Sequence, residues 1–233
     1  MRVFFGKARS ATLALLVLAA LTPISARASE TDDAILAEIN FARENPQAYA
    51  WQLLMKPISD WEQELGPNGP ATDPTARTEA IAFLMRQTPL PPLQSDDKLA
   101  AAALEHVADQ GPVGAIGHDG PTGERFDARI RRHGVPAALA AENIAYGPAR
   151  PSDVVRELII DSGVPNRGHR RNIFYDGLEY AGVSCGPHKD YAAMCVIDFV
   201  GLTADPASWR DAAAELRPAS PGGPRYRLFN GQD

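Results

Sequence analysis

The chain is poor in cysteine and in positive charge. It has only two cysteines in 233 residues, and 23 Lys and Arg stand against 29 Asp and Glu. Beyond residue 28 it also lacks any run close to the ~20 apolar residues that a membrane-spanning helix needs, and it shows no repeat or heptad pattern. These absences argue against nucleic acid and anionic lipid as partners, and against a transmembrane segment after residue 28.

The first 28 residues are typical of a secretory signal peptide. Residues 1–10 are basic, residues 11–24 are mostly apolar, and residues 26–28 (ARA) fit the A-x-A pattern for cleavage before Ser29. Cleavage leaves 19 basic residues against 29 acidic ones, so the formal charge changes from -6 to -10. The sequence therefore predicts a secreted protein, periplasmic or extracellular, whose remaining ~205 residues form one domain.

The two cysteines are spaced for a hairpin. Cys185 and Cys195 flank the turn-rich residues 186–190, and residues 180–184 and 191–200 have the pattern of strands. A hairpin folded near Asp190 would bring the two sulfur atoms opposite each other, and an oxidising compartment favours a disulfide bond. The alternative is a pair of buried free thiols.

Apolar periodicity predicts several helices. Residues 32–54 form one helix with a break at Pro46, or two in succession, and residues 78–85 form a short one. A helix capped by Ser95 has a buried stripe of Leu99, Ala103 and Val107. Two more helices are predicted, at residues 124–133 and from Ser152 to Gly163.

Residues 161–173 combine a carboxylate, an imidazole and three guanidinium groups. Asp161 follows an apolar helical run, so its charge lies at the negative end of the helix dipole, which costs up to ~1 kcal/mol unless a cation or metal compensates. We therefore expect a neighbouring group to satisfy Asp161. Arg167, Arg170 and Arg171 could bind an anionic ligand group, but neutralisation of Asp161 and nearby acids is the favoured interpretation.

Several sequence pieces, in this order, resemble the CAP superfamily of cysteine-rich secretory proteins, antigen 5 proteins and pathogenesis-related 1 proteins, and its bacterial secreted members in particular. They are residues 92–99 (PLQSDDKL) before a helix, 117–118 (GH), 141–145 (AENIA), 168–173 (GHRRNI) and the closing hairpin. The resemblance implies an α+β fold, a three-layer α-β-α sandwich with a small antiparallel sheet. It predicts a CAP/SCP-like domain at residues 29–201, with an insertion at about residues 51–90. Residues 202–233 are then a Pro/Gly-rich tail with little regular structure.

The resemblance also places four side chains in one cleft. His118 and His169 match the two histidines of the family, Glu142 matches the first acid, and Asp161 stands where the second acid is usually glutamate. Two imidazoles and two carboxylates suit Zn²⁺ or another divalent cation, although the shorter Asp161 would hold it differently or through water. The alternatives are that His118 is a polar loop residue and that His169 only packs against Asp161.

Other polar residues are given lesser roles. Asn143 and Asn172 are expected to support the cleft by hydrogen bonds to the backbone. His106 and His133 are interpreted as helix-surface residues and His188 as a turn residue, none of them functional.

Two functions follow from these patterns. The first is a binding module whose cleft holds a divalent metal or a small-molecule, lipid-like or protein ligand; the lipid-like class is implied only by the family. The second is a metal-dependent hydrolase, peptidase-like, in which Glu142 or Asp161 is the general base for a metal-activated water. Binding is favoured, because no nucleophile or oxyanion hole is identifiable. Residues 182–186 (GVSCG) fit the nucleophile elbow of α/β-hydrolases, but the strand-turn-helix context of that motif is missing.

Overall fold

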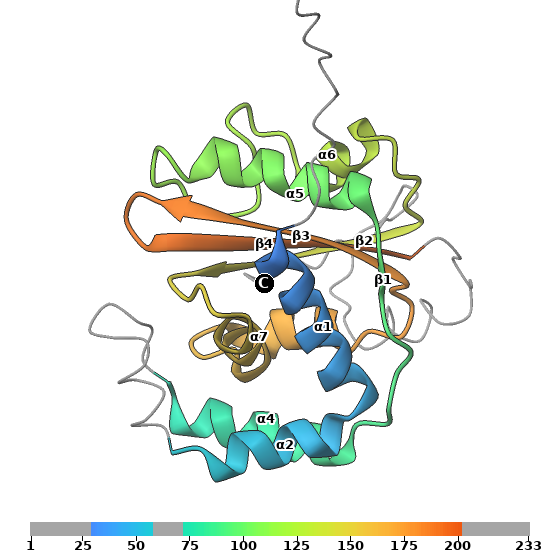
Figure 1. The fold of residues 1–233 in the computed structure, drawn as a ribbon, viewed down its shortest axis with the longest axis vertical. Helices are drawn as coiled ribbons and strands as arrows, with labels where there is room; N and C mark the ends of the chain where they lie inside the picture. Colours follow the sequence, from blue (N-terminus) through green and yellow to red (C-terminus); the bar gives the residue numbers. More distant parts are fainter. Residues whose placement is uncertain (1–28, 58–71, 202–233) are drawn as a thin grey trace, which may run out of the picture.

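Residues 29–57 and 72–201 are described by the computed structural model (Figure 1). The predicted signal peptide, the predicted tail and residues 58–71 of the predicted insertion lie outside these ranges. The helices are α1 (Glu30–Glu44), α2 (Pro46–Met55), α4 (Pro74–Arg86), α5 (Asp97–Gln110), α6 (Phe126–Arg132), α7 (Pro151–Ile160) and α8 (Gly168–Ile173), with a 3₁₀ turn η1 (Pro165–Arg167). The strands are β1 (Gln94–Ser95), β2 (Leu139–Tyr146), β3 (Tyr180–His188) and β4 (Ala192–Gly201).

The sheet has the order β1-β3-β4-β2. The long strands β2, β3 and β4 pair antiparallel, as predicted, whereas the two-residue β1 runs parallel to β3 and makes the sheet mixed. Helices α5 and α6 cover one face of the sheet and α1 and α7 lie on the other, with the α2–α4 pair outside them (Figure 1). The predicted α+β, α-β-α architecture is confirmed.

The alternation of side chains along β2 decides which layer each of its residues faces. Ala140 and Ile144 pack in the apolar clusters under α5 and α6. Ala141 and Ala145 pack in the larger cluster with α1 and α7. The alternation therefore sends the side chain of Glu142 toward α5 and α6.

The predicted helices are present, with shifted ends. The break at Pro46 divides α1 from α2, where proline occupies the first turn of the second helix. The cap of α5 is Asp96 and not Ser95, because the Asp96 carboxylate accepts two backbone N–H groups of the first turn, while Ser95 belongs to β1. The stripe of Leu99, Ala103 and Val107 is buried as predicted.

The hairpin of β3 and β4 carries the disulfide. Cys185 and Cys195 are direct cross-strand partners, and their sulfur atoms are bonded. The disulfide prediction is confirmed and the free-thiol alternative is wrong. Residues 182–186 run straight through β3, where Ser184 is 5% exposed. The nucleophile-elbow geometry is absent from this strand.

Candidate functional site

His118 and Glu142 form the first of two imidazole–carboxylate pairs. His118 Nδ1 lies 2.7 Å from Glu142 Oε1. The Glu142 side chain is fully buried on β2, and the His118 side chain, in the loop after α5, is 10% exposed. Burial lowers the pKa of His118, and Arg129 lowers it further. The imidazole is therefore neutral at pH 7, and Nδ1 is the nitrogen that donates to the carboxylate.

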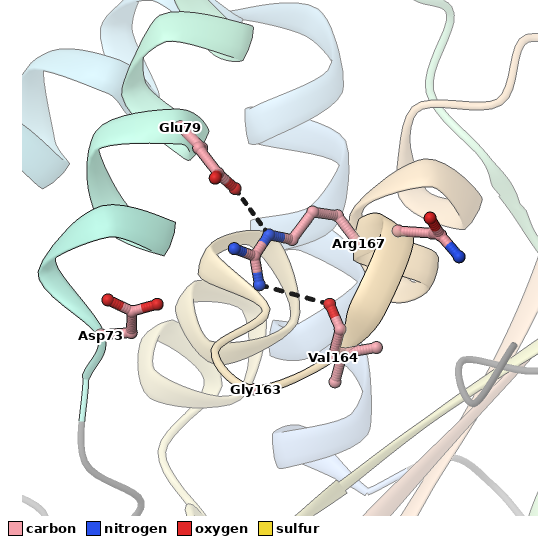
Figure 2. Close-up of a pocket in the computed structure, with 6 residues that line it drawn as sticks. Asp73, Glu79, Gly163, Val164 and Arg167 are labelled. Atoms are coloured by element: carbon pink, nitrogen blue, oxygen red, sulfur yellow. Dashed lines mark hydrogen bonds and ion pairs between the residues drawn. The ribbon is translucent and has the colours of Figure 1, made fainter.

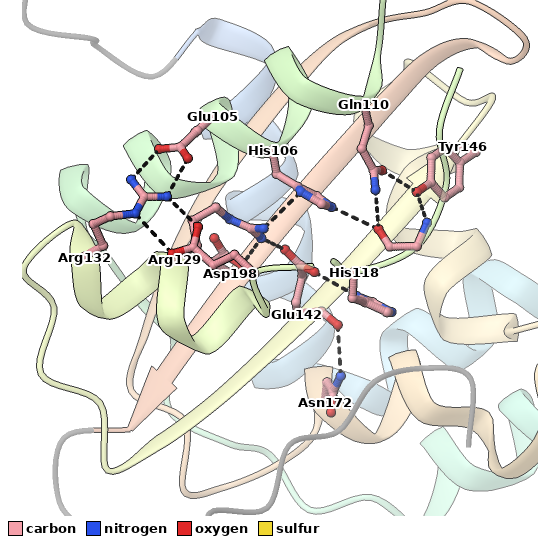
Figure 3. Close-up of polar contacts among 12 residues, drawn as sticks. Glu105, His106, Gln110, His118, Arg129, Arg132, Glu142, Tyr146, Asn172 and Asp198 are labelled. Carbon is pink, nitrogen blue, oxygen red and sulfur yellow. Dashed lines mark hydrogen bonds and ion pairs between the residues drawn. The ribbon is translucent and has the colours of Figure 1, made fainter. Parts of the chain in front are cut away.

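A buried arginine and a second buried acid complete this first pair. Arg129 donates through Nη2 to Glu142 Oε2, and the same nitrogen lies 3.9 Å from Asp198 Oδ1 (Figure 3). Asp198 is the cross-strand partner of Glu142 on β4, and both acids are fully buried. Burial raises the pKa of Asp198 well above its ordinary range and that of Glu142 to about 7, against the opposing charge of Arg129.

The proton of this acid pair belongs on Asp198. Within the described residues no donor reaches either oxygen of Asp198, whereas Glu142 receives hydrogen bonds from Arg129 and His118. As a carboxylate, Asp198 would thus be a buried charge without a donor. As an acid, it can donate to Glu142, and the cluster keeps one cation and one anion.

We expect Asp198→Asn to be tolerated at pH 7 and to flatten the pH dependence of stability. In the folded protein Asp198 keeps a proton that it releases near pH ~3.9 in the unfolded chain. Above that pH the contribution of Asp198 to the free energy of unfolding falls by up to ~1.4 kcal/mol for each pH unit. The decline ends at the raised pKa of the folded protein. Asparagine has no such ionisation and can still donate to Glu142. Urea unfolding of both proteins between pH 4 and pH 7 measures the difference; a steeper decline in the variant would contradict the assignment.

Asp161 and His169 form the second pair. His169 Nδ1 lies 2.7 Å from Asp161 Oδ1, and the backbone N–H of His169 donates to Asp161 Oδ2 at 2.9 Å. Asp161 ends α7 in the left-handed conformation (φ 60°), which Asp tolerates better than most residues. The aspartate side chain is 1% exposed and the histidine 15% exposed. The expectation that a neighbouring group satisfies Asp161 is confirmed.

The guanidinium groups of Arg167 and Arg170 donate to backbone oxygens, and the backbone N–H of Arg170 donates to Asp161 Oδ2 at 3.4 Å. Arg170 Nε donates to Ile159 O at 2.5 Å and Nη2 to Ile160 O at 2.9 Å, so this guanidinium caps the C-terminal end of α7. Arg167 Nη1 donates to the Asp161 carbonyl at 2.7 Å. The prediction that these arginines neutralise Asp161 and nearby acids is confirmed for Arg167, which forms an ion pair with Glu79. Near Asp161 the positive charges of Arg167 and Arg170 also stabilise the end of the helix.

Arg167 also spans a shallow pocket on the outer surface (Figure 2). Its Nε lies 2.7 Å from Glu79 Oε2, and its Nη1 donates to Val164 O at 3.2 Å. The pocket is lined by Asp73, Glu79, Gly163, Val164, Asn166 and Arg167. None of the four predicted cleft residues lines it, so it is separate from the two imidazole–carboxylate pairs.

Two asparagines connect the pairs, in part through hydrogen bonds to backbone oxygens. Asn143, next to Glu142 on β2, donates to His169 O at 3.1 Å. Asn172 donates to Asn143 Oδ1 at 2.8 Å and to Glu142 O at 3.4 Å. The strand that carries Glu142 is therefore bonded directly to α8, which carries His169.

In both pairs Nε2 is the free imidazole nitrogen. Each ring contacts its carboxylate through Nδ1, and neither Nε2 hydrogen-bonds to another described residue. Within residues 29–57 and 72–201, no group of three or more His, Cys, Asp and Glu side chains is arranged to hold a metal ion. The metal site made of His118, Glu142, Asp161 and His169 stays a prediction.

Two of the three other histidine interpretations are wrong. His106 is 0% exposed and contacts Arg129, and its place one turn beyond Ala103 on the apolar stripe is the sequence signal that would have found it. His188 is 2% exposed at the end of β3, where its Nδ1 accepts backbone N–H groups and its Nε2 lies 2.9 Å from Ala115 O. His133 is partly exposed and contacts Glu105.

Comparisons with known proteins identify the family. The model of the CAP family, described as the cysteine-rich secretory protein family, matches residues 36–199. The match covers more than half of the chain, so this protein belongs to the CAP family. No helix in the described residues is long and apolar enough to cross a membrane.

Individual relatives share only part of their length with this chain, at low sequence identity. The uncharacterized protein YkwD of Bacillus subtilis is 33% identical over 95 residues, which is 40% of this chain and 35% of the relative. The chain thus spans about a third of that relative's length. An extracellular SCP-domain protein of Bacillus anthracis has a TM-score of 0.41 at 22% identity, over 62% of this chain and 41% of that one. An outer surface protein of Borrelia burgdorferi has a TM-score of 0.42 at 22% identity, over 48% and 79%.

Proposed function

We propose that this CAP-family protein is exported and that its two imidazoles, His118 and His169, hold a divalent cation such as Zn²⁺ in an open site for a small ligand. Export is supported by the signal-peptide pattern of residues 1–28 and by the Cys185–Cys195 disulfide, a bond typical of oxidising compartments. The ligand belongs to the small-molecule, lipid-like or protein classes.

One observation supports the cation most strongly. In each pair a buried carboxylate takes Nδ1 at 2.7 Å, and Nε2 is left without a partner on a partly exposed ring. Histidines that bind metals usually donate their second nitrogen to a carboxylate in this way, which fixes the tautomer and the ring orientation. Glu142 and Asp161 therefore orient the ligands and do not themselves need to reach the ion.

Two imidazole nitrogens leave coordination positions for water or a ligand atom, since Zn²⁺ takes four or five donors. The same contacts favour binding over hydrolysis. Glu142 is occupied by Arg129 and His118, and Asp161 by His169. Neither acid is free to serve as the general base that a metal-dependent hydrolase requires.

Elemental analysis and calorimetric titration of the protein from Ser29 onward test the proposal. We expect one Zn²⁺ per chain, weaker binding of Mg²⁺, and no detectable Zn²⁺ binding by the His118→Ala/His169→Ala double variant. Glu142→Gln and Asp161→Asn should each weaken binding roughly 10- to 100-fold without abolishing it, because they orient the ligands. His133→Ala is the matched control, since the only hydrogen bond of the His133 side chain to a described residue is to Glu105, and the substitution should leave affinity unchanged.

Equal Zn²⁺ affinity in the wild type and the double variant would contradict the proposal. Hydrolysis is tested separately with peptide and ester substrates, with and without a chelator. Chelator-sensitive turnover that Glu142→Gln abolishes would replace the binding function by the hydrolase.

A further inference from the structure

Arg129 on α6 connects two groups that both lead to His118. Its side chain is 2% exposed, and its guanidinium donates to Glu142 Oε2 through Nη2 and contacts His106 Nδ1 through Nη1 at 2.9 Å (Figure 3). Its Nε is buried and has no acceptor among the described residues. A buried donor without an acceptor lowers stability, so the burial of this guanidinium carries an energetic cost.

The first connection runs through the carboxylate. Because Arg129 occupies Oε2 of Glu142, the remaining oxygen Oε1 lies toward His118 and accepts its Nδ1–H. This contact fixes the rotation of the imidazole and leaves the lone pair on Nε2. Arg129 thereby sets the orientation of His118 without touching it.

The second connection runs through the backbone. A guanidinium can only donate, so His106 Nδ1 accepts from Arg129, and the proton of the neutral ring is on Nε2. That Nε2 lies 2.9 Å from Gly117 O, to which it donates. Gly117 directly precedes His118, so Arg129 also fixes the peptide that carries the imidazole.

A ring of hydrogen bonds closes around Gly117 and holds both of its peptide groups. Gln110 Nε2 donates to Gly117 O at 2.7 Å, and Gly117 N–H donates to the Tyr146 hydroxyl at 2.9 Å. The Tyr146 hydroxyl donates in turn to Gln110 Oε1 at 2.9 Å. Gly117 has φ 104°, a conformation that requires glycine, although a Cβ there would meet nothing within 4 Å. The backbone before His118 is therefore held in one defined geometry.

We propose that Arg129 is a positioning residue for His118. Through Glu142 it fixes the imidazole of His118, and through His106 and Gly117 it fixes the backbone of His118. This inference rests on the proposed function, in which His118 Nε2 is a metal ligand. It adds that α6, which supplies no predicted cleft residue, keeps the lone pair of His118 Nε2 available for a metal ion.

Arg129→Lys is the decisive variant, because lysine keeps the charge but cannot contact Glu142 and His106 at once with a planar fork. Long-range ¹H–¹⁵N NMR of the metal-free protein reports the tautomer of His118. In the wild type we expect a single Nδ1–H tautomer, and in Arg129→Lys a mixture of the two tautomers with Zn²⁺ affinity roughly 10- to 100-fold weaker. Arg132→Lys is the matched control on the same helix, since Arg132 contacts only Glu105 and Glu124 among the described residues and should behave as wild type.

His106→Leu separates the two connections and decides the question if Arg129→Lys does not fold. It removes the hydrogen bond to Gly117 O and the acceptor of Arg129 Nη1, but it leaves the contact of Arg129 with Glu142. The tautomer of His118 should therefore persist while the Gly117 amide exchanges about tenfold faster than in the wild type. An unchanged tautomer in Arg129→Lys, or an unchanged Gly117 exchange rate in His106→Leu, would overturn the inference. Both NMR readouts use metal-free protein, so a wild type that binds no Zn²⁺ would end the proposed function and leave this test standing.

Discussion

Gly182→Ala is expected to destabilise the protein by about 3 kcal/mol or more. A Cβ at Gly182 in β3 would lie 2.1 Å from the backbone nitrogen of Ala100 and 2.3 Å from the carbonyl carbon of Leu99. Both atoms belong to the backbone of α5, which cannot move away without opening the packing of that helix on the sheet. This glycine therefore permits the close approach of α5 to β3.

Gly186→Ala is the matched comparison, because Gly186 lies on the same strand and faces the same helix. Its Cβ would meet only the Val107 side chain, at 2.5 Å from Cγ1. A side-chain methyl group can move more easily than a helix backbone, so the loss should stay near about 1 kcal/mol. Urea and thermal unfolding of the disulfide-intact proteins measure both values; equal losses would refute the argument from backbone contact.

Close packing against α5 thus explains both glycines of the G-x-S-x-G pattern at residues 182–186. The motif coincides with that of a nucleophile elbow because α5 crosses the strand closely at these two positions. A short motif is specific only together with the geometry that it serves.

Arg43→Met is expected to cost about 3 to 5 kcal/mol, because it removes a buried charge that satisfies carbonyls from separate segments. Arg43 in α1 is 1% exposed. Its Nε donates to Pro91 O at 3.0 Å and its Nη1 to Ile173 O at 2.6 Å. It also donates to the carbonyls of Tyr175 and Leu178. Burial lowers the pKa of this guanidinium to about 10, which still leaves it charged at pH 7.

Loss of Arg43 leaves these carbonyls without their donor and releases the turn after α8 from α1. Chemical denaturation compares this variant with Arg86→Gln, an exposed arginine that should change the free energy of unfolding by no more than about 0.5 kcal/mol. If Arg43→Met cost less than about 1 kcal/mol, water would have to replace the guanidinium, and the structural role assigned here would be wrong.

The elements that were predictable from sequence depend on local patterns. Apolar periodicity located the helices because each buries one face, and Pro46 marked the break between α1 and α2. The turn-rich spacing between Cys185 and Cys195 predicted the hairpin and its disulfide. The helix cap was misplaced by one residue, since Ser95 and Asp96 are both good caps and only the pairing of β1 decides between them.

The partners in the site were not predictable in the same way. Asp198 stands alone in an apolar strand, which indicates a buried acid, but its position opposite Glu142 follows from the register of β2 and β4. The spacing of Arg129 from Phe126 and Ile130 places it on the buried face of its helix, but its contacts with Glu142 and His106 do not follow from the sequence. His106 was misjudged although its spacing placed it on the buried face.

The sequence by itself determined the helices and the disulfide hairpin, and its resemblance to a family singled out two histidines and two acids. Only the tertiary structure decided that each acid contacts a histidine, that Asp198 holds the proton, and that Arg129 joins Glu142 to His106. The physical reason is that side chains far apart in the sequence meet only once the sheet register and the docking of α6 are fixed, and charge and protonation follow from those contacts.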